Sequence, residues 1–158
     1  DFMTGIQFLN FVADIFEVGA KERQERIRKY ADMFELTEDL AQPISAYSHG
    51  MKQKVALISA FVHQPRLLVL DEPFVGLDPK ASAVLKQEMR ALCAQGSAIF
   101  FSTHVLEVAE KLCDKVAMID HGHIVVSGSV EELTREASLE EVFLEQLELA
   151  KAQVESHA

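Results

Sequence analysis

The sequence has little cysteine and no tryptophan. Cys93 and Cys113 are the two cysteines among 158 residues, and they form no Cys-x-x-Cys pair. A disulfide framework and a cysteine metal site are therefore excluded, and a reducing, cytoplasmic setting is expected. We interpret both cysteines as small core residues.

Basic residues are also scarce. Lys and Arg number 15 against 25 Asp and Glu, so the formal net charge is −10. Because nucleic-acid binding relies on clustered Lys and Arg, we predict no nucleic-acid partner. Apolar residues make up 49% of the chain, which is enough to build a core and excludes a wholly disordered protein.

Long hydrophobic runs are missing too. No stretch reaches the ~18 apolar residues of a membrane-spanning helix, and the chain does not begin with a basic segment followed by an apolar one. Any role at a membrane therefore needs a partner protein.

Residues 1–64 predict an all-helical subdomain. Apolar residues recur at helical spacing over residues 6–16, where Thr4 and Gln7 are placed to form a capping box. The last helix of this subdomain is expected over residues 48–62.

Residues 65–135 alternate short apolar runs with helical patterns, and residues 136–158 predict a terminal helix. Strands are expected at 67–70, 98–101 and 116–119, with an antiparallel partner at 124–126. Helices are expected at 80–94, 105–112, 130–133 and 139–154. The run 67–70 is typical of a strand buried on both faces. The order predicts an α/β fold whose sheet is mainly parallel and flanked by helices.

Two acids stand directly after the first strand. Asp71 and Glu72 fall where open α/β sheets place their ligands, at the carboxyl end of a strand. Since neighbouring strand residues point to opposite sides, the two acids are expected to serve different tasks. One carboxylate suits Mg²⁺, and the other can orient or deprotonate a water molecule. The alternative is the start of a solvated loop.

Three further motifs lie near this strand in sequence or in the expected sheet. Asp78, within Gly-Leu-Asp-Pro, is placed to cap the following helix. His104 follows the next strand and can bond a phosphate oxygen or a water molecule. Ser48 opens a helix that continues with Gly50 and two lysines, which predicts either an anion site or an ordinary N-cap.

Taken in order, these motifs resemble those of ATP-binding-cassette (ABC) ATPases. Residues 47–51 resemble the signature motif, 67–71 the Walker B strand with Glu72 in the place of the catalytic glutamate, 76–79 the D-loop and 102–104 the switch region. His49 and Met51 depart from the usual Gly and Gln of the signature. Such variants, with a tail like residues 139–143, resemble the ABC-2-type exporter branch.

The family's P-loop has no counterpart in the sequence. A P-loop needs Gly-x-x-x-x-Gly-Lys, and no lysine of this chain follows a glycine. The chain therefore resembles the C-terminal part of an ATPase subunit, namely the helical subdomain and the second half of a P-loop NTPase-like core.

The resemblance implies ATP and Mg²⁺ as cofactors and assigns roles to eight residues. Glu72 and His104 would be catalytic and Asp71 would hold the metal. The nucleotide would be contacted by Ser48, His49, Gly50, Met51 and Asp78.

The resemblance also implies partners. The full-length protein would hydrolyse ATP to drive transport, together with a transmembrane permease subunit and a second ATPase subunit, at the cytoplasmic face of the cell membrane. Without a P-loop, this chain is expected not to hydrolyse ATP alone. An exposed sheet edge would favour self-association.

Two other functions are consistent with the same motifs. The chain could be a non-catalytic regulatory or assembly module that supplies a signature helix. It could also belong to a soluble ABC-type ATPase of DNA repair or translation. The short span between residues 4 and 48 and the net charge of −10 favour transport.

Overall fold

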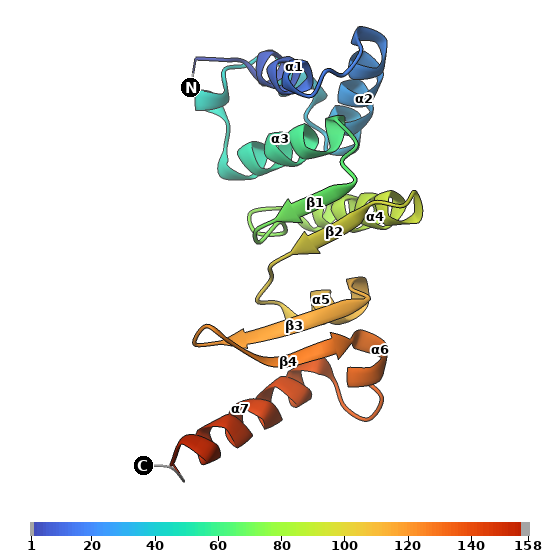
Figure 1. The fold of residues 1–158 in the computed structure, drawn as a ribbon. Helices are drawn as coiled ribbons and strands as arrows, with labels where there is room; N and C mark the ends of the chain where they lie inside the picture. Colours follow the sequence, from blue (N-terminus) through green and yellow to red (C-terminus); the bar gives the residue numbers. More distant parts are fainter. Residues whose placement is uncertain (1, 156–158) are drawn as a thin grey trace. The chain divides into compact units, whose positions relative to one another are not determined.

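A computed structural model describes residues 2–155 of the chain, with side chains through residue 149. The chain divides into two compact units, residues 1–102 and 103–158. The helices and strands follow the order shown in Figure 1. The subdomain boundaries predicted after residues 64 and 135 stay predictions.

The first unit begins with three α-helices, α1 (Gly5–Ile15), α2 (Ala20–Met33) and α3 (His49–Val62), with short 3₁₀ turns at residues 37–39 and 44–46. The predicted capping box opens α1. The Gln7 amide donates to Thr4 Oγ1 at 3.3 Å, and the Thr4 amide donates to Gln7 Oε1 at 2.9 Å. These bonds satisfy two of the amides that a helix start leaves without partners.

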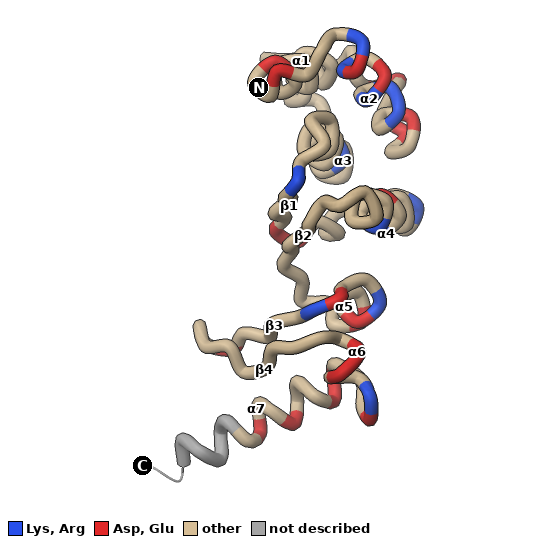
Figure 2. The backbone as a smooth tube through the Cα atoms, turned by 45° about the vertical axis from the view of Figure 1, so that its right-hand side comes forward, with Lys and Arg blue, Asp and Glu red and all other residues tan. Residues whose placement is uncertain are grey.

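The three helices pack around one apolar core. Its fully buried side chains include Leu9, Phe34, Ile58 and Phe61. Along α2, Lys and Arg alternate with acidic residues, as Figure 2 shows, and the buried positions of that helix are Ile27, Tyr30 and Ala31. The charged run is therefore a solvated helix face, as predicted.

The second half of this unit is a strand–helix–strand segment. β1 (Leu67–Leu70) pairs in parallel with β2 (Ala98–Phe101), and α4 (Pro79–Ala94) connects them. The register places Leu67 opposite Ala98 and Leu70 opposite Phe101. Asp78 caps α4 and Pro79 occupies its first position, which confirms the prediction.

The prediction that residues 67–70 are buried on both faces is wrong in this structure. Leu68 is buried, but Leu67 and Val69 are exposed by 63% and 64%, and Phe100 on the neighbouring strand is 68% exposed. Because strand side chains alternate, these three share one face of the β1–β2 pair. An apolar run shows only that the strand lacks polar residues. It does not show whether another element covers each face of the strand.

The second unit is a small antiparallel sheet with three helices, α5 (Leu106–Leu112), α6 (Val130–Leu133) and α7 (Leu139–Glu155). β3 (Lys115–Asp120) and β4 (His123–Ser129) pair across a turn at His121 and Gly122, which both have positive φ. The predicted antiparallel partner is thus confirmed. Four residues buried together form the core of this unit: Ala109, Met118, Val126 and Leu139.

The cysteines differ in their surroundings. Cys113 is half-buried against the core of the second unit, where burial raises the pKa of its thiol. Cys93 is exposed on α4, so its interpretation as a core residue is wrong. The buried stripe of α4 passes through Leu92 instead, one residue earlier.

Candidate functional site

The two acids after β1 are held by a serine at the end of β2. Ser102 Oγ donates to Asp71 Oδ1 at 2.5 Å and accepts a bond of 2.9 Å from the Glu72 amide. The parallel register brings residue 102 beside residue 71, since Leu70 pairs with Phe101. The prediction that the end of the second strand lies beside the acids is confirmed for Ser102.

Glu72 has an unusual backbone. Its φ is +44°, a conformation that non-glycine residues adopt at a cost of about 1–3 kcal/mol. The chain therefore turns sharply directly after Asp71. Strained residues of this kind persist where the surroundings hold them, and here the Ser102 hydroxyl holds the Glu72 amide.

The acid pair has the chemistry of a partial magnesium site. Mg²⁺ is usually bound by one or two carboxylates together with substrate phosphates and water, not by a complete protein cage. Asp71 supplies such a carboxylate next to a serine hydroxyl. Among the described residues, no group of three or more His, Cys, Asp and Glu could hold a metal ion by itself. The residues therefore fit a metal shared with a phosphate ligand.

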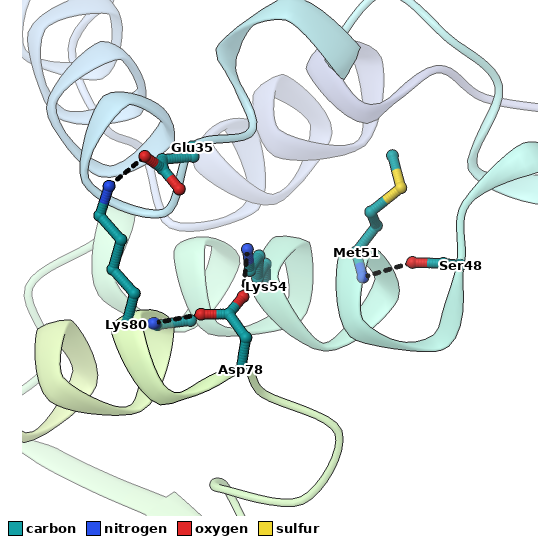
Figure 3. Close-up of polar contacts among 7 residues, drawn as sticks. Glu35, Ser48, Met51, Lys54, Asp78 and Lys80 are labelled. Atoms are coloured by element: carbon teal, nitrogen blue, oxygen red, sulfur yellow. Dashed lines mark hydrogen bonds and ion pairs between the residues drawn. The ribbon is translucent and has the colours of Figure 1, made fainter.

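Ser48 caps α3, as predicted. Its Oγ accepts a bond of 3.2 Å from the Met51 amide, drawn in Figure 3. The first turn of α3 contains His49, Gly50 and Met51, so three of the five predicted nucleotide contacts follow one N-cap. A helix start presents amide groups and a positive dipole end, which suit an anion.

The first turn of α3 lies directly against the turn at Gly76. A Cβ at Gly50 would lie 2.8 Å from the Gly76 carbonyl oxygen. A Cβ at Gly76 would lie 2.6 Å from Cδ2 of the His49 ring, and the φ of Gly76 is +80°. Both positions therefore require glycine, because a side chain at either one would clash. The signature-like and D-loop-like segments are thus in contact within one chain.

Asp78 uses both carboxylate oxygens inside the chain (Figure 3). Oδ1 accepts a bond of 2.8 Å from the Ala81 amide, and Oδ2 lies 3.0 Å from Nζ of Lys54 on α3. The Ala81 amide and the Lys54 ammonium lower the pKa of Asp78. This carboxylate is therefore held in its charged form.

His104 belongs to the second unit, whereas the acids and the signature-like helix belong to the first. Its assignment as a catalytic residue stays a prediction.

Sequence reasoning missed Lys54 and Gln53 as neighbours of the Asp78 loop. Gln53 Nε2 donates to the Pro73 carbonyl at 3.2 Å. A signal for Lys54 was present, since it precedes Ile58 and Phe61 by four and seven residues. A lysine on the apolar stripe of a helix needs a partner when that stripe is buried.

The comparisons with known proteins extend over most of the chain. A family model described as "AAA domain, putative AbiEii toxin, Type IV TA system" matches residues 5–110, more than half of the sequence. An uncharacterized ABC transporter ATP-binding protein of Synechocystis is 36% identical over 135 residues, which are 84% of this chain and 38% of that protein. The chain belongs to the family of ABC transporter ATP-binding proteins.

Further matches agree with this family. The Nod factor export ATP-binding protein I of Sinorhizobium fredii is 36% identical over 113 residues, 72% of this chain and 33% of that protein. A solved structure of the ATP-binding subunit of an ABC transporter is similar with a TM-score of 0.87 at 33% identity. It covers 92% of this chain, and this chain covers 62% of it. The resemblance and the P-loop NTPase-like α/β fold predicted from the sequence are thus confirmed.

The chain spans about two fifths or less of the length of these two curated relatives. None of the helices in the described part is long and apolar enough to cross a membrane.

Proposed function

We propose that this chain supplies the signature and Walker B side of a nucleotide site in an ATP-driven membrane transporter. The observation that carries the proposal is the Asp71–Glu72 pair held by Ser102 at the carboxyl end of β1. In the same unit, the first turn of α3 lies against the Gly76 turn. Membership of the ABC ATP-binding family supplies the ligands, ATP and Mg²⁺.

The residues of the chain have distinct roles in this proposal. Asp71 would hold Mg²⁺, and Glu72 would orient and polarise the water that attacks the terminal phosphate. His104 contacts that phosphate. The metal, when bound, neutralises charge on the phosphates, so the protein contributes positioning and electrostatics.

The first turn of α3 acts on a nucleotide held by a second ATPase subunit. Ser48, His49, Gly50 and Met51 face the phosphates from across the interface between subunits. Asp78, which is tied to both α3 and α4, couples the two sites of the pair. The sequence contains no lysine after a glycine, so the P-loop of each site must come from elsewhere and the chain alone does not hydrolyse ATP.

A transmembrane permease is the second proposed partner, which places the protein at the cytoplasmic face of a membrane. The helical surface of residues 4–62 would face this permease. It includes a groove between α1 and α2 with an apolar floor at Ile6, Ile27 and Leu40 and with Arg23 and Arg28 along it. The export activity in the name of the Sinorhizobium relative supports an exporter-type transporter.

The test is a calorimetric titration of Mg-ATP into this chain, with a Glu72→Gln variant alongside. We expect no binding by either protein, because the P-loop that cradles the phosphates is missing. Adding an ATP-loaded, P-loop-bearing subunit should then produce binding that a Ser48→Ala variant weakens. Tight binding of Mg-ATP by the isolated chain would contradict the proposal. A failure of Ser48→Ala to weaken binding in the assembled complex would contradict the proposed role of the first turn of α3.

A further inference from the structure

Three contacts dock α3 onto the loop that leads from the acids to α4. The His49 ring covers the Cα of Gly76, Gln53 bonds the Pro73 carbonyl, and Lys54 pairs with Asp78. These α3 residues fall within six positions of one another, so they form one continuous contact along the start of the helix.

The ion pair joins a largely buried ammonium to a half-exposed carboxylate. The Lys54 side chain is 15% exposed, whereas the Asp78 side chain is 51% exposed. A largely buried ammonium needs a partner, because leaving it unpaired costs several times the value of an ordinary surface ion pair. By contrast, the neighbouring Lys80–Glu35 pair joins two exposed side chains and contributes little.

The two contacts of Asp78 fix the orientation of its carboxylate. Because the Ala81 amide binds Oδ1 and the Lys54 ammonium lies on Oδ2, the plane of the carboxylate is set from two elements at once. Figure 3 shows Lys54 reaching Asp78 from α3, the same helix whose first turn follows the Ser48 cap. A shift of α3 would therefore move the Asp78 carboxylate.

We propose that Lys54 is a positioning residue for Asp78, so that the signature helix and the D-loop turn act as one body. The inference rests on the proposed function, because it gives Asp78 its role between the two nucleotide sites. Lys54 touches no nucleotide in this arrangement. It acts by fixing where the Asp78 carboxylate points.

The first arm of the test measures the contact in this chain. Carboxyl carbon NMR follows the titration of Asp78 in the wild type and in three variants. Lys54→Met removes the ammonium but keeps the apolar stem, and Lys54→Arg keeps a positive charge. Lys52→Met is the matched control, since Lys52 is an exposed lysine on the same helix. We expect the pKa of Asp78 to rise in Lys54→Met, to return toward the wild-type value in Lys54→Arg, and to be unchanged in Lys52→Met.

The second arm measures ATP hydrolysis by this chain assembled with a P-loop-bearing ATPase subunit. We expect Lys54→Met to lower kcat roughly ten-fold or more, the scale of a misplaced group that does not itself react, with KM for ATP little changed. Lys54→Arg should restore most of kcat. A purely structural role would instead lower the amount of folded enzyme without this split between kcat and KM.

The outcomes separate the two proposals. If the wild-type chain assembled with a P-loop-bearing subunit shows no hydrolysis, the proposed function has failed, and the carboxyl titration alone decides whether Lys54 sets Asp78. If Lys54→Met leaves both the pKa of Asp78 and kcat at their wild-type values, the positioning role is overturned.

Discussion

The hydroxyl of Tyr30 on α2 donates a 3.0 Å hydrogen bond to Glu88 on α4, and both residues are almost completely buried. Lys29 adds an ion pair of 2.9 Å to the same carboxylate oxygen. Glu88 is thus a buried charge with two donors, and it ties the helical segment to α4, the helix that Asp78 caps. Removing one partner of a buried hydrogen bond lowers stability by more than the bond's net contribution, because the other partner stays buried without a hydrogen bond.

We expect Glu88→Ala to lower the free energy of unfolding by about 2–3 kcal/mol, since it leaves the buried Tyr30 hydroxyl without its acceptor. Glu88→Gln keeps an acceptor and should cost less. Tyr30→Phe should cost about 1–2 kcal/mol, because Lys29 still compensates the carboxylate. Urea unfolding measures all three.

The matched control for Glu88 is Lys21→Ala, an exposed substitution on α2 that should change stability by less than about 0.5 kcal/mol. The double variant of Glu88→Ala and Tyr30→Phe should lose less unfolding free energy than the sum of the losses in the two single variants. Strict additivity would show that the bond between the two side chains contributes nothing.

Both tyrosines should resist ionisation at alkaline pH. Burial, followed by the charge of Glu88 for Tyr30 and of Asp39 for Tyr47, raises the pKa of each phenol. The pKa of a tyrosine in the unfolded chain is about 10. At pH values below this pKa the stabilisation is complete, and it is lost as the pH rises through the higher pKa of the folded chain.

Near-ultraviolet absorbance measures this directly, because the chain has two tyrosines and no tryptophan. Just above pH ~10 the folded chain should show little tyrosinate, and the urea-unfolded chain should show roughly half or more. In Tyr30→Phe, the folded chain should show one transition, that of Tyr47, at a higher pH than in the unfolded chain. Equal titration curves for the folded and unfolded chain would contradict the burial of these phenols.

His63 should make the folded chain less stable as the pH falls into the acidic range. Its ring stacks on Phe16 with centroids 3.8 Å apart, and burial lowers the pKa of the imidazole. The unfolded chain therefore takes up a proton near pH ~6.5 that folded His63 takes up only at lower pH. The stabilisation is complete above about pH 6.5 and is lost as the pH falls below it.

Urea unfolding between about pH 5 and 8 tests this, with His63→Phe as the matched variant that keeps a stacked ring. The wild type should lose more stability than His63→Phe as the pH falls, while the two converge in slope above pH ~7. The difference between the two proteins removes the contribution of the other histidines. Parallel curves over the whole range would rule out a role for His63.

Local signals explain why the element bounds could be predicted closely from the sequence. The capping box of Thr4 and Gln7, the Ser48 cap and the Asp78–Pro79 start each fix a helix start within its own segment. The order of the motifs was likewise sufficient to identify the family. These features depend on neighbours in the chain, which a sequence shows directly.

Contacts between distant segments were the part that could not be predicted. Glu88 and Lys54 each lie on the apolar stripe of a helix, and each has its partner on another element. The pattern marks such a residue as needing a partner but does not name it. The exposure of Leu67 and Val69 could not be predicted for the same reason. Whether another layer covers a strand depends on packing between distant segments.

Gly76 offers a test of the contact between α3 and the loop before α4. Its φ is +80° and the His49 ring lies where a Cβ would go, whereas Gly96 has a φ of +95° and nothing within 4 Å. Gly96→Ala therefore measures backbone strain alone, about 1 kcal/mol, while Gly76→Ala adds the displacement of His49 and should cost about 2–4 kcal/mol. In a His49→Ala background, Gly76→Ala should fall close to the cost of Gly96→Ala. Thermal and urea unfolding of the wild type, the three single variants and the double variant measure this. An unchanged cost of Gly76→Ala in the His49→Ala background would mean that His49 does not hold the turn.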